Sequence, residues 1–405
     1  MSDIRKEQAQ KALQKKALYG GDIDLKQFLT RSPEESYKQD LSQLPPEMVG
    51  QILSAGIETK EESRSATYLQ RNHSVIHCQT RQEGVEVLNI DEALAKYDWL
   101  HKYCWNMVSV DQDKYTAMAY LHPHHGYFIR ALPGTKTTLP VQACLYLEQA
   151  NLVQNVHNIV IVEEGSELNI ITGCAGSPRP GKGLHIGISE FYVKKGARLT
   201  FTMIHNWAED MEVRSRSAAE VENFGVFISN YISMKKIGSL QMYPVTFLRG
   251  KDALARYYNI LVAPRGANLD VGSCVHLDAP GSRAEIQSRA ISTGGQIFAR
   301  GRLIGKAENT KAHLECRGLL LEKGGMIQAV PELEAHLSGV DLSHEAAVGK
   351  IAQEEIHYLM ARGLPEAEAI AAIVRGFLNV DIVGLPKELQ SELNRVVEES
   401  EKTLL

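Results

Sequence analysis

The chain has 405 residues, of which 44% are hydrophobic, and a formal net charge of -5. A chain of this size and composition can bury a large core, which excludes a disordered or fibrous protein. The small negative charge, without a lysine or arginine stripe along a predicted helix, argues against nucleic acid as a partner.

Targeting and redox signals point to the cell interior. Residues 1–18 are rich in Lys, Gln and Glu and lack the apolar centre of a signal peptide. No apolar run is long enough to cross a bilayer, so we expect no membrane association. The six cysteines stand singly, with no CxxC pair: Cys78, Cys104, Cys144, Cys174, Cys274 and Cys316. This pattern is typical of reduced thiols, and we expect a cytoplasmic protein.

Residues 1–112 are expected to form a mainly helical N-terminal domain. Prolines at Pro33 and Pro45 interrupt this region, and the stretch 90–105 has helical spacing.

From about Tyr115 the pattern changes to short alternating apolar runs, which are typical of strands. A turn glycine, a small residue and an alternating strand recur at 165–170, 196–201, 266–271 and 281–286. In a fifth copy Asn309 replaces the glycine, which is consistent because Asn tolerates left-handed backbone angles. Stacked units of this kind predict a β-helix core over residues 113–343, with a β-sandwich as the competing fold.

After Ser343 the pattern becomes helical, and residues 344–405 are expected to form a C-terminal helical domain. Ser343 stands where it can cap a helix that ends near Gly363. Pro365 and Pro386 occupy first helical positions of two further helices. A unit this small should cover the end of the core or bind a partner.

The densest group of metal-binding and acid–base side chains comprises His313, Glu315, Cys316, His336, His344 and Glu345. In a strand, Cys316 points to the same side as Leu314 and away from His313 and Glu315. A thiolate near imidazole and carboxylate groups suits iron or a persulfide. The alternative for Cys316 is a small buried core residue, and helix capping alone explains Ser343 to Glu345 equally well.

Two other groups are open to two interpretations. Cys174 is flanked by glycines, which suits either an accessible thiol or a tight turn. His122, His124 and His125 offer three imidazoles to a transition metal, but they have no Cys or carboxylate partner at fixed spacing, so a polar surface turn competes. Phosphate-loop, dinucleotide, serine-hydrolase and zinc-protease motifs are absent, so nucleotide chemistry within this chain is not expected.

From about Tyr115 to its C-terminus the chain resembles the SufB/SufD family of iron–sulfur cluster assembly proteins. The resemblance is carried by Gly339 and by segments 164–166, 173–174, 205–207, 316–321, 344–351, 358–364 and 375–377. The pattern HEAxxxKI at 344–351, followed by RGF at 375–377, is the most specific part. His205 departs from the Gln that is common in bacterial SufB, and the first hundred residues match more weakly.

The resemblance implies a right-handed parallel β-helix between two helical domains. It implies a scaffold rather than an enzyme, whose C-terminal helices dock an ABC-type ATPase called SufC and whose β-helix pairs with a second SufB/SufD-type subunit, with a homodimer expected. Cys174 matches the cysteine that accepts sulfur, with a path near Trp207 toward Cys316, the assembly cysteine. Cys316, Glu345 and His344 would ligate the iron of a transient iron–sulfur cluster.

Two other hypotheses compete with the scaffold. The first is an adaptor for an ABC ATPase that holds no cluster of its own. The second is a polysaccharide-acting β-helix enzyme, which is disfavoured because such enzymes are exported and carry an open groove of acidic and basic residues. Fold alone does not decide among the three, because one fold hosts many functions.

Overall fold

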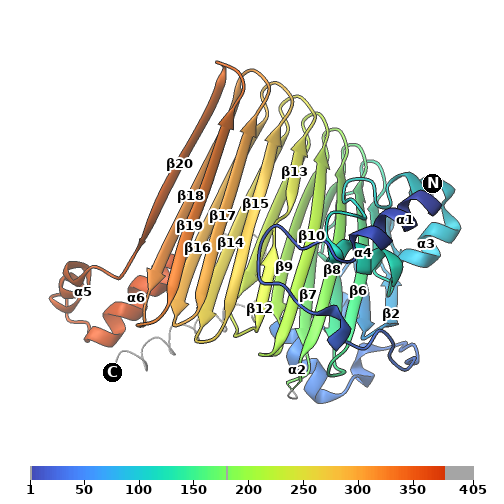
Figure 1. Cartoon of the computed structure of the whole chain (residues 1–405), viewed down its shortest axis with the longest axis horizontal. Helices are drawn as coiled ribbons and strands as arrows, with labels where there is room; N and C mark the ends of the chain where they lie inside the picture. The colour runs from blue at the N-terminus through green and yellow to red at the C-terminus, as the bar shows by residue number, and fades with distance from the viewer. Residues whose placement is uncertain (1, 179–180, 379–405) are drawn as a thin grey trace.

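The computed structural model describes residues 2–178 and 181–378, and most of this chain forms two long sheets (Figure 1). The first sheet contains, in spatial order, β2 (Ser74–Thr80), β1 (Ala66–Arg71), β5 (Val141–Leu147), β7 (Glu167–Gly176), β9 (Arg198–Asn206), β11 (Val226–Ser233), β14 (Leu254–Pro264), β16 (Arg283–Thr293), β18 (Thr310–Leu320) and β20 (Val340–Gly349). The second contains β19 (Met326–Ala335), β17 (Gln296–Gly305), β15 (Asn268–Leu277), β12 (Ser239–Met242) with β13 (Val245–Leu248), β10 (Met211–Val221), β8 (Gly183–Val193), β6 (Val153–Val162), β4 (Tyr127–Ala131) and β3 (Val85–Asn89).

From β4 onward the chain winds as a solenoid, because it passes from one sheet to the other and pairs in parallel with the preceding turn. Side-chain ladders give the repeat length: Asn230 donates a hydrogen bond to Thr202, 28 residues away, and Asn259 to Ser288, 29 residues away. The parallel ladders confirm the predicted β-helix, since a β-sandwich is built from antiparallel sheets. The right-handed sense of the winding stays a prediction.

The repeated turns adopt the backbone conformation that the sequence predicts. The φ angles are 70° at Gly165, 64° at Gly196, 86° at Gly266 and 75° at Gly281, and Asn309 takes 58° in the fifth copy. These angles lie in the left-handed region, which Gly enters without cost and Asn with little. The repeat therefore specifies where each turn ends and the next strand begins.

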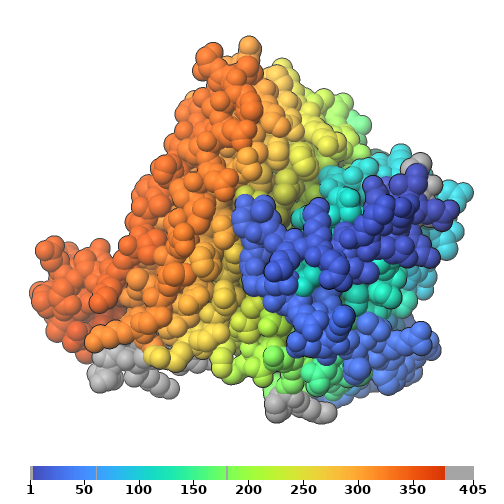
Figure 2. Space-filling model, viewed as in Figure 1, coloured from blue at the N-terminus to red at the C-terminus, as the bar shows by residue number. Residues whose placement is uncertain are grey.

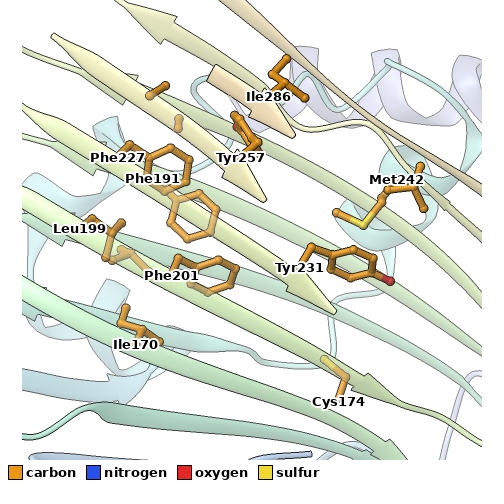
Figure 3. Close-up of a cluster of buried hydrophobic side chains, with 14 of the residues drawn as sticks. Ile170, Cys174, Phe191, Leu199, Phe201, Phe227, Tyr231, Met242, Tyr257 and Ile286 are labelled. Atoms are coloured by element: carbon orange, nitrogen blue, oxygen red, sulfur yellow. The ribbon is translucent and has the colours of Figure 1, made fainter. Parts of the chain in front are cut away.

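One face of each sheet points into the interior of the solenoid, where aromatic and aliphatic side chains from both sheets meet (Figure 3). The ring of Phe191, on β8, lies 4.7 Å from that of Phe201 on β9 and 5.5 Å from that of Phe227 on β11. Each buried ring contributes roughly 1.5–3 kcal/mol through removal of apolar surface from water. This continuous interior core holds the turns together.

Helices cover the outer faces. The helix α2 (Pro46–Ser54) packs on β7 and β9 of the first sheet, and α4 (Lys114–Leu121) packs on β6 and β8 of the second, with α1 (Ser2–Ala12) against α4. Figure 2 shows this N-terminal part, in blue, spread over one end of the solenoid. No helix in the described ranges is both long and apolar enough to cross a membrane.

The N-terminal region is more mixed than the expected helical domain. The remaining helices before the solenoid are η1 (Leu25–Gln27), η2 (Leu41–Gln43), η3 (Glu61–Ser63), α3 (Ile90–Lys96) and η4 (Asp98–Lys102). The last two confirm helix in the stretch 90–105. Residues 66–89, which lie within the region expected to be mainly helical, supply β1, β2 and β3, because β1 extends the parallel ladder against β5 and β3 pairs antiparallel with β4.

At the C-terminal end the predicted cap at Ser343 is wrong. Ser343 lies within β20, which pairs with β18, and its hydroxyl is 2.9 Å from His313 Nδ1. The first helix, α5 (Gln353–Met360), begins ten residues later and is followed by Gly363 at φ 96°. The second predicted helix is confirmed as α6 (Glu366–Leu378), whereas the one at Pro386 lies outside the described residues.

Candidate functional site

Cys174 lies inside the solenoid. Its residue is only 1% exposed, it belongs to the interior core, and burial raises the pKa of its thiol. The preceding Gly173 faces outward, where a Cβ atom would lie 2.5 Å from Ile57 Cγ1 and 2.6 Å from the Ala55 carbonyl oxygen. The glycine therefore allows α2 to approach the sheet, while the thiol points inward (Figure 3). The sequence left two interpretations open for Cys174, an accessible thiol or a tight turn. The structure shows neither, because Cys174 is buried within strand β7.

A group of polar aromatic side chains in contact with one another begins beside Cys174, at His205. We call Cys174, His185, His205, Trp207 and Tyr231 the inner cluster. His205 is the partner of Cys174 on the next turn, and its Nδ1 lies 2.8 Å from the Tyr231 hydroxyl. The Trp207 ring centroid is 4.9 Å from that of His185 and 5.9 Å from that of His205. Burial lowers the pKa of both histidines to about 3, so their imidazoles are neutral.

The inner cluster borders unfilled space. Tyr231 also lines an interior cavity together with Met203, Met242 and Tyr257. The indole N–H of Trp207 is buried and has no hydrogen-bond partner within the described ranges. His185 and Tyr231 were not predicted as site residues. Strand alternation in β8 and β11 could have predicted that both side chains point inward. It could not have predicted which turns of the solenoid lie next to each other, and so which residues these side chains contact.

Cys316 occupies the same interior further along the solenoid. It lies on β18, is 3% exposed and shares the interior core with Leu314, whereas Glu315 points outward, so Cys316 and Glu315 face opposite sides of the strand, as predicted. Burial raises the pKa of its thiol to about 11, against the opposing charge of Arg289. The interpretation as a buried core residue thus describes its packing correctly.

The structure does not bring Cys316 and Glu345 together within one chain. In the parallel ladder Glu345 pairs with Glu315 and His344 with Leu314, so Glu345 lies on the outer face of β20 and His344 on the inner face. Cys316 pairs with Ala346 on that inner face. No group of three or more His, Cys, Asp or Glu side chains suited to a metal ion occurs in the part of the chain that the structure describes.

The outer side of β18 carries a charged network instead. Glu315 accepts a hydrogen bond from Arg289 at 2.9 Å and also pairs with Arg317, which reaches Glu345 at 3.4 Å. Burial acts to raise the pKa of Glu315, but the two arginines outweigh it and hold that pKa below the ordinary value. Glu345 itself is 59% exposed, so it stays available to solvent.

The other predicted histidines are dispersed. His313 contacts Ser343, and His336 lies 2.7 Å from Glu334 at the surface. The His124 ring stacks on that of His73 with centroids 3.5 Å apart, and the His125 ring contacts Asp91. These contacts fix the 122–125 segment against its neighbours. They favour the interpretation of a polar turn over a metal site.

Comparisons with known proteins find similar sequences along most of the chain. The model of the SufBD core domain of SUF-system FeS cluster assembly matches residues 145–377. An iron–sulfur cluster assembly SufBD family protein of Archaeoglobus fulgidus is 51% identical over 354 residues, which cover 87% of this chain and 95% of that protein. One from Methanothermobacter thermautotrophicus strain Delta H is 46% identical over 400 residues, covering 97% and 98%. The iron–sulfur cluster assembly protein SufB of Bacillus subtilis is 29% identical over 395 residues, covering 94% and 84%.

Proposed function

Because the chain belongs to the SufBD family of iron–sulfur cluster assembly proteins, we propose that it is a scaffold subunit on which iron and sulfur are built into a labile cluster. The observation that carries the proposal is the placement of two thiols, Cys174 and Cys316, on the inner face of one sheet. Cys174 would accept sulfane sulfur, and Cys316 would receive it and ligate iron, since thiolates are soft ligands. The chemistry belongs in the cytoplasm, where free thiols stay reduced.

The hard ligands would come from the end of the solenoid. His344 lies on the inner face of β20 beside the strand of Cys316, and Glu345 lies on the outer face. Since one chain does not assemble these groups around one point, a second subunit would complete the ligand set. A carboxylate or imidazole ligand releases a cluster more readily than an all-thiolate cage.

The last turn of the solenoid favours pairing with a second copy of the chain. Within the described ranges β19 and β20 end the two sheets, so each has one unpaired edge. Leu333 is 38%, Leu337 44% and Val348 40% exposed at this end. Unpaired strand edges beside exposed apolar side chains are typical of an association surface.

The C-terminal helices offer a separate surface for an ATPase partner of the SufC type. The apolar stripe of α6 packs on the outer face of the first sheet, as Ile370 and Val374 are buried there. On α5, in contrast, Tyr358 is 59% and Met360 39% exposed. We assign the docking of the ATPase to this exposed face of α5, with ATP hydrolysis in the partner and none in this chain.

The test is anaerobic reconstitution with ferrous iron and sulfide after co-purification with a SufC-type ATPase. Visible absorbance of a cluster is expected for the wild type and lost in Cys316→Ser. Cys274→Ser is the matched control, because Cys274 is also buried, at 4% exposure, with a thiol pKa that burial raises to about 12, yet it lies outside the interior core.

Two results would count against the proposal. Equal absorbance in wild type and Cys316→Ser would remove Cys316 from the site. A wild-type chain that binds the ATPase but gains no cluster would support the alternative function, an adaptor subunit without a cluster of its own.

A further inference from the structure

A different thiol, Cys104, lies outside the interior of the solenoid, on the outer side of the second sheet. It follows η4, and its Sγ is 3.6 Å from Nδ1 of His157 on β6. Nε2 of the same imidazole is 2.9 Å from Oε2 of Glu190 on the neighbouring strand β8. We call Cys104, His157 and Glu190 the Cys104 triad. A thiol, an imidazole and a carboxylate in this order form the arrangement that activates a cysteine nucleophile.

The carboxylate of the triad is held rigidly. Glu190 is 0% exposed, and besides His157 it accepts hydrogen bonds from four successive backbone N–H groups, those of Trp105, Asn106, Met107 and Val108, at 2.6 to 3.2 Å. The segment after Cys104 is therefore wrapped around the carboxylate. Both the thiol and the imidazole are positioned by the same buried group.

This geometry sets the proton positions on His157. Because a carboxylate only accepts, Nε2 carries the proton that it donates to Glu190, and the lone pair of Nδ1 faces the Cys104 sulfur. Burial acts to lower the pKa of His157, but its contacts with Cys104 and Glu190 outweigh this and raise the pKa to about 9. Nδ1 is therefore placed to take the thiol proton when Cys104 reacts.

The surroundings of the other thiols differ. Burial raises the pKa of Cys78 to about 12 and of Cys316 to about 11, and it also raises that of Cys174. Cys78 is half-buried, like Cys104, but its sulfur faces the carbonyl oxygen of Val87 at 3.5 Å. A carbonyl oxygen cannot stabilise a thiolate, so Cys78 is a natural control for Cys104.

We propose that Cys104 is an activated thiol that accepts sulfane sulfur from a persulfide, with His157 as its base and Glu190 as a positioning residue. The inference rests on the proposed function, because a protein that accepts sulfur for cluster assembly needs a thiol that reacts with the sulfur donor. It adds an entry site outside the interior, on a half-buried residue, whereas Cys174 and Cys316 in the interior are almost fully buried. The donor is defined by its chemistry, R–S–SH.

The reaction balances without an oxidant. His157 takes the proton of Cys104, and the thiolate attacks the outer sulfur of R–S–SH. A new S–S bond forms on Cys104 as the S–S bond of the donor breaks, and R–S⁻ leaves and takes the proton from His157. The products are Cys104–S–SH and R–SH, so the sulfane sulfur is transferred with no net change in oxidation.

The test compares two thiols in the same wild-type chain. The full-length protein is treated anaerobically with limiting cysteine persulfide, first folded and then in urea, and the persulfide on each cysteine is quantified by peptide mass spectrometry. In the folded protein we expect Cys104 to be modified at least about 10-fold faster than Cys78, as for a thiol activated by an imidazole. In urea the two rates should converge, because both environments are lost.

Variants then test the roles within the triad. His157→Gln should slow the modification of Cys104 about 10-fold and leave Cys78 unchanged, while Glu190→Gln should have a smaller effect in the same direction. Circular dichroism identifies any variant that fails to fold, and the wild-type comparison of Cys104 with Cys78 does not depend on either variant. Equal folded-state rates for Cys104 and Cys78 would overturn the inference. The triad would then serve only to hold the segment after Cys104 against the second sheet. The readout uses no iron, so a failed cluster assay and a failed Cys104 assay are distinguished.

Discussion

At the candidate site, the charged side chains and the thiol lie on opposite faces of strand β18. Glu315 and Cys316 are adjacent, yet the carboxylate is bound by Arg289 on the outer face while the thiol is in the apolar interior. Arg289 is 15% and Glu315 9% exposed at the side chain, so this ion pair is largely removed from water. Loss of one partner leaves the other buried without a counter-charge, which is costly.

Glu315→Gln should lower the free energy of unfolding at neutral pH by roughly 1–3 kcal/mol, because Arg289 keeps its charge in a poorly hydrated place. The pKa of Glu315 is depressed in the folded state, so its contribution is present above the ordinary value of 4.5 and is lost as the pH falls through the folded value. The difference between wild type and variant should therefore shrink on acidification. Urea unfolding followed over this pH range measures it.

The control for this prediction is Glu164→Gln. Glu164 pairs with Lys195 at 2.9 Å, but the two side chains are 64% and 58% exposed. An exposed pair contributes at most about 1 kcal/mol, so this variant should unfold almost like the wild type at every pH. Equal losses for the two variants would show that the Glu315 network has no special role.

Asn309 allows a second test at the level of one residue. Its φ of 58° suits Asn and Gly but strains other side chains. Asn309→Ala should lower the free energy of unfolding by about 1–2 kcal/mol, whereas Asn309→Gly should leave it within about 1 kcal/mol of the wild type. Thermal unfolding of the two variants distinguishes them, and a loss of equal size in both would mean that a side-chain contact of Asn309, rather than its backbone angle, is responsible.

Among the secondary-structure elements, local signals predicted those parts of the fold that depend on local geometry. The glycine turns follow from chain sterics, and the shared side of Cys316 and Leu314 follows from strand alternation, so both were predictable. Ser343 was not, because a serine before a helical pattern is a good cap until a neighbouring strand offers pairing. Because Ser343 lies in a strand and not at a helix cap, Glu345 faces outward on β20. No local sequence pattern predicts this position.

The close approach of α2 to β7 is the element contact most sensitive to a single atom. A Cβ atom at Gly173 would meet Ile57 and the Ala55 backbone, just beyond the end of α2. Gly173→Ala should therefore cost about 1–3 kcal/mol and speed hydrogen exchange in α2. Gly349→Ala, on β20, is the control, because its Cβ would have no atom within 4 Å. Unchanged exchange in Gly173→Ala would mean that α2 is held by other contacts.

At the scale of the whole molecule, the two ends of the solenoid differ. The first turns are covered by α2, α3 and α4, whereas in the last turn most residues of β20 are exposed and most residues of β19 are half-buried. The sequence repeat predicts a solenoid of stacked turns. Because the repeat is the same in every turn, it does not predict which end of the solenoid is covered by helices. The exposed end also carries His344 and lies beside Cys316, so pairing there would place two copies of these residues near each other.

If two copies pair at this end, a charge placed among its apolar side chains should separate them. Leu333→Asp puts a carboxylate where Leu333 is now 38% exposed on β19, and burying that charge in a dimer should raise the dissociation constant at least about 10-fold. Phe224→Asp is the control, since Phe224 is 54% exposed in a turn between β10 and β11, away from this end. Sedimentation equilibrium should show a dimer for the wild type and the control and a shift to monomer for Leu333→Asp. If all three chains are monomers, the proposed cluster ligands must instead come from a partner that is not a second copy of this chain, and if all three are dimers, Leu333 lies outside the interface.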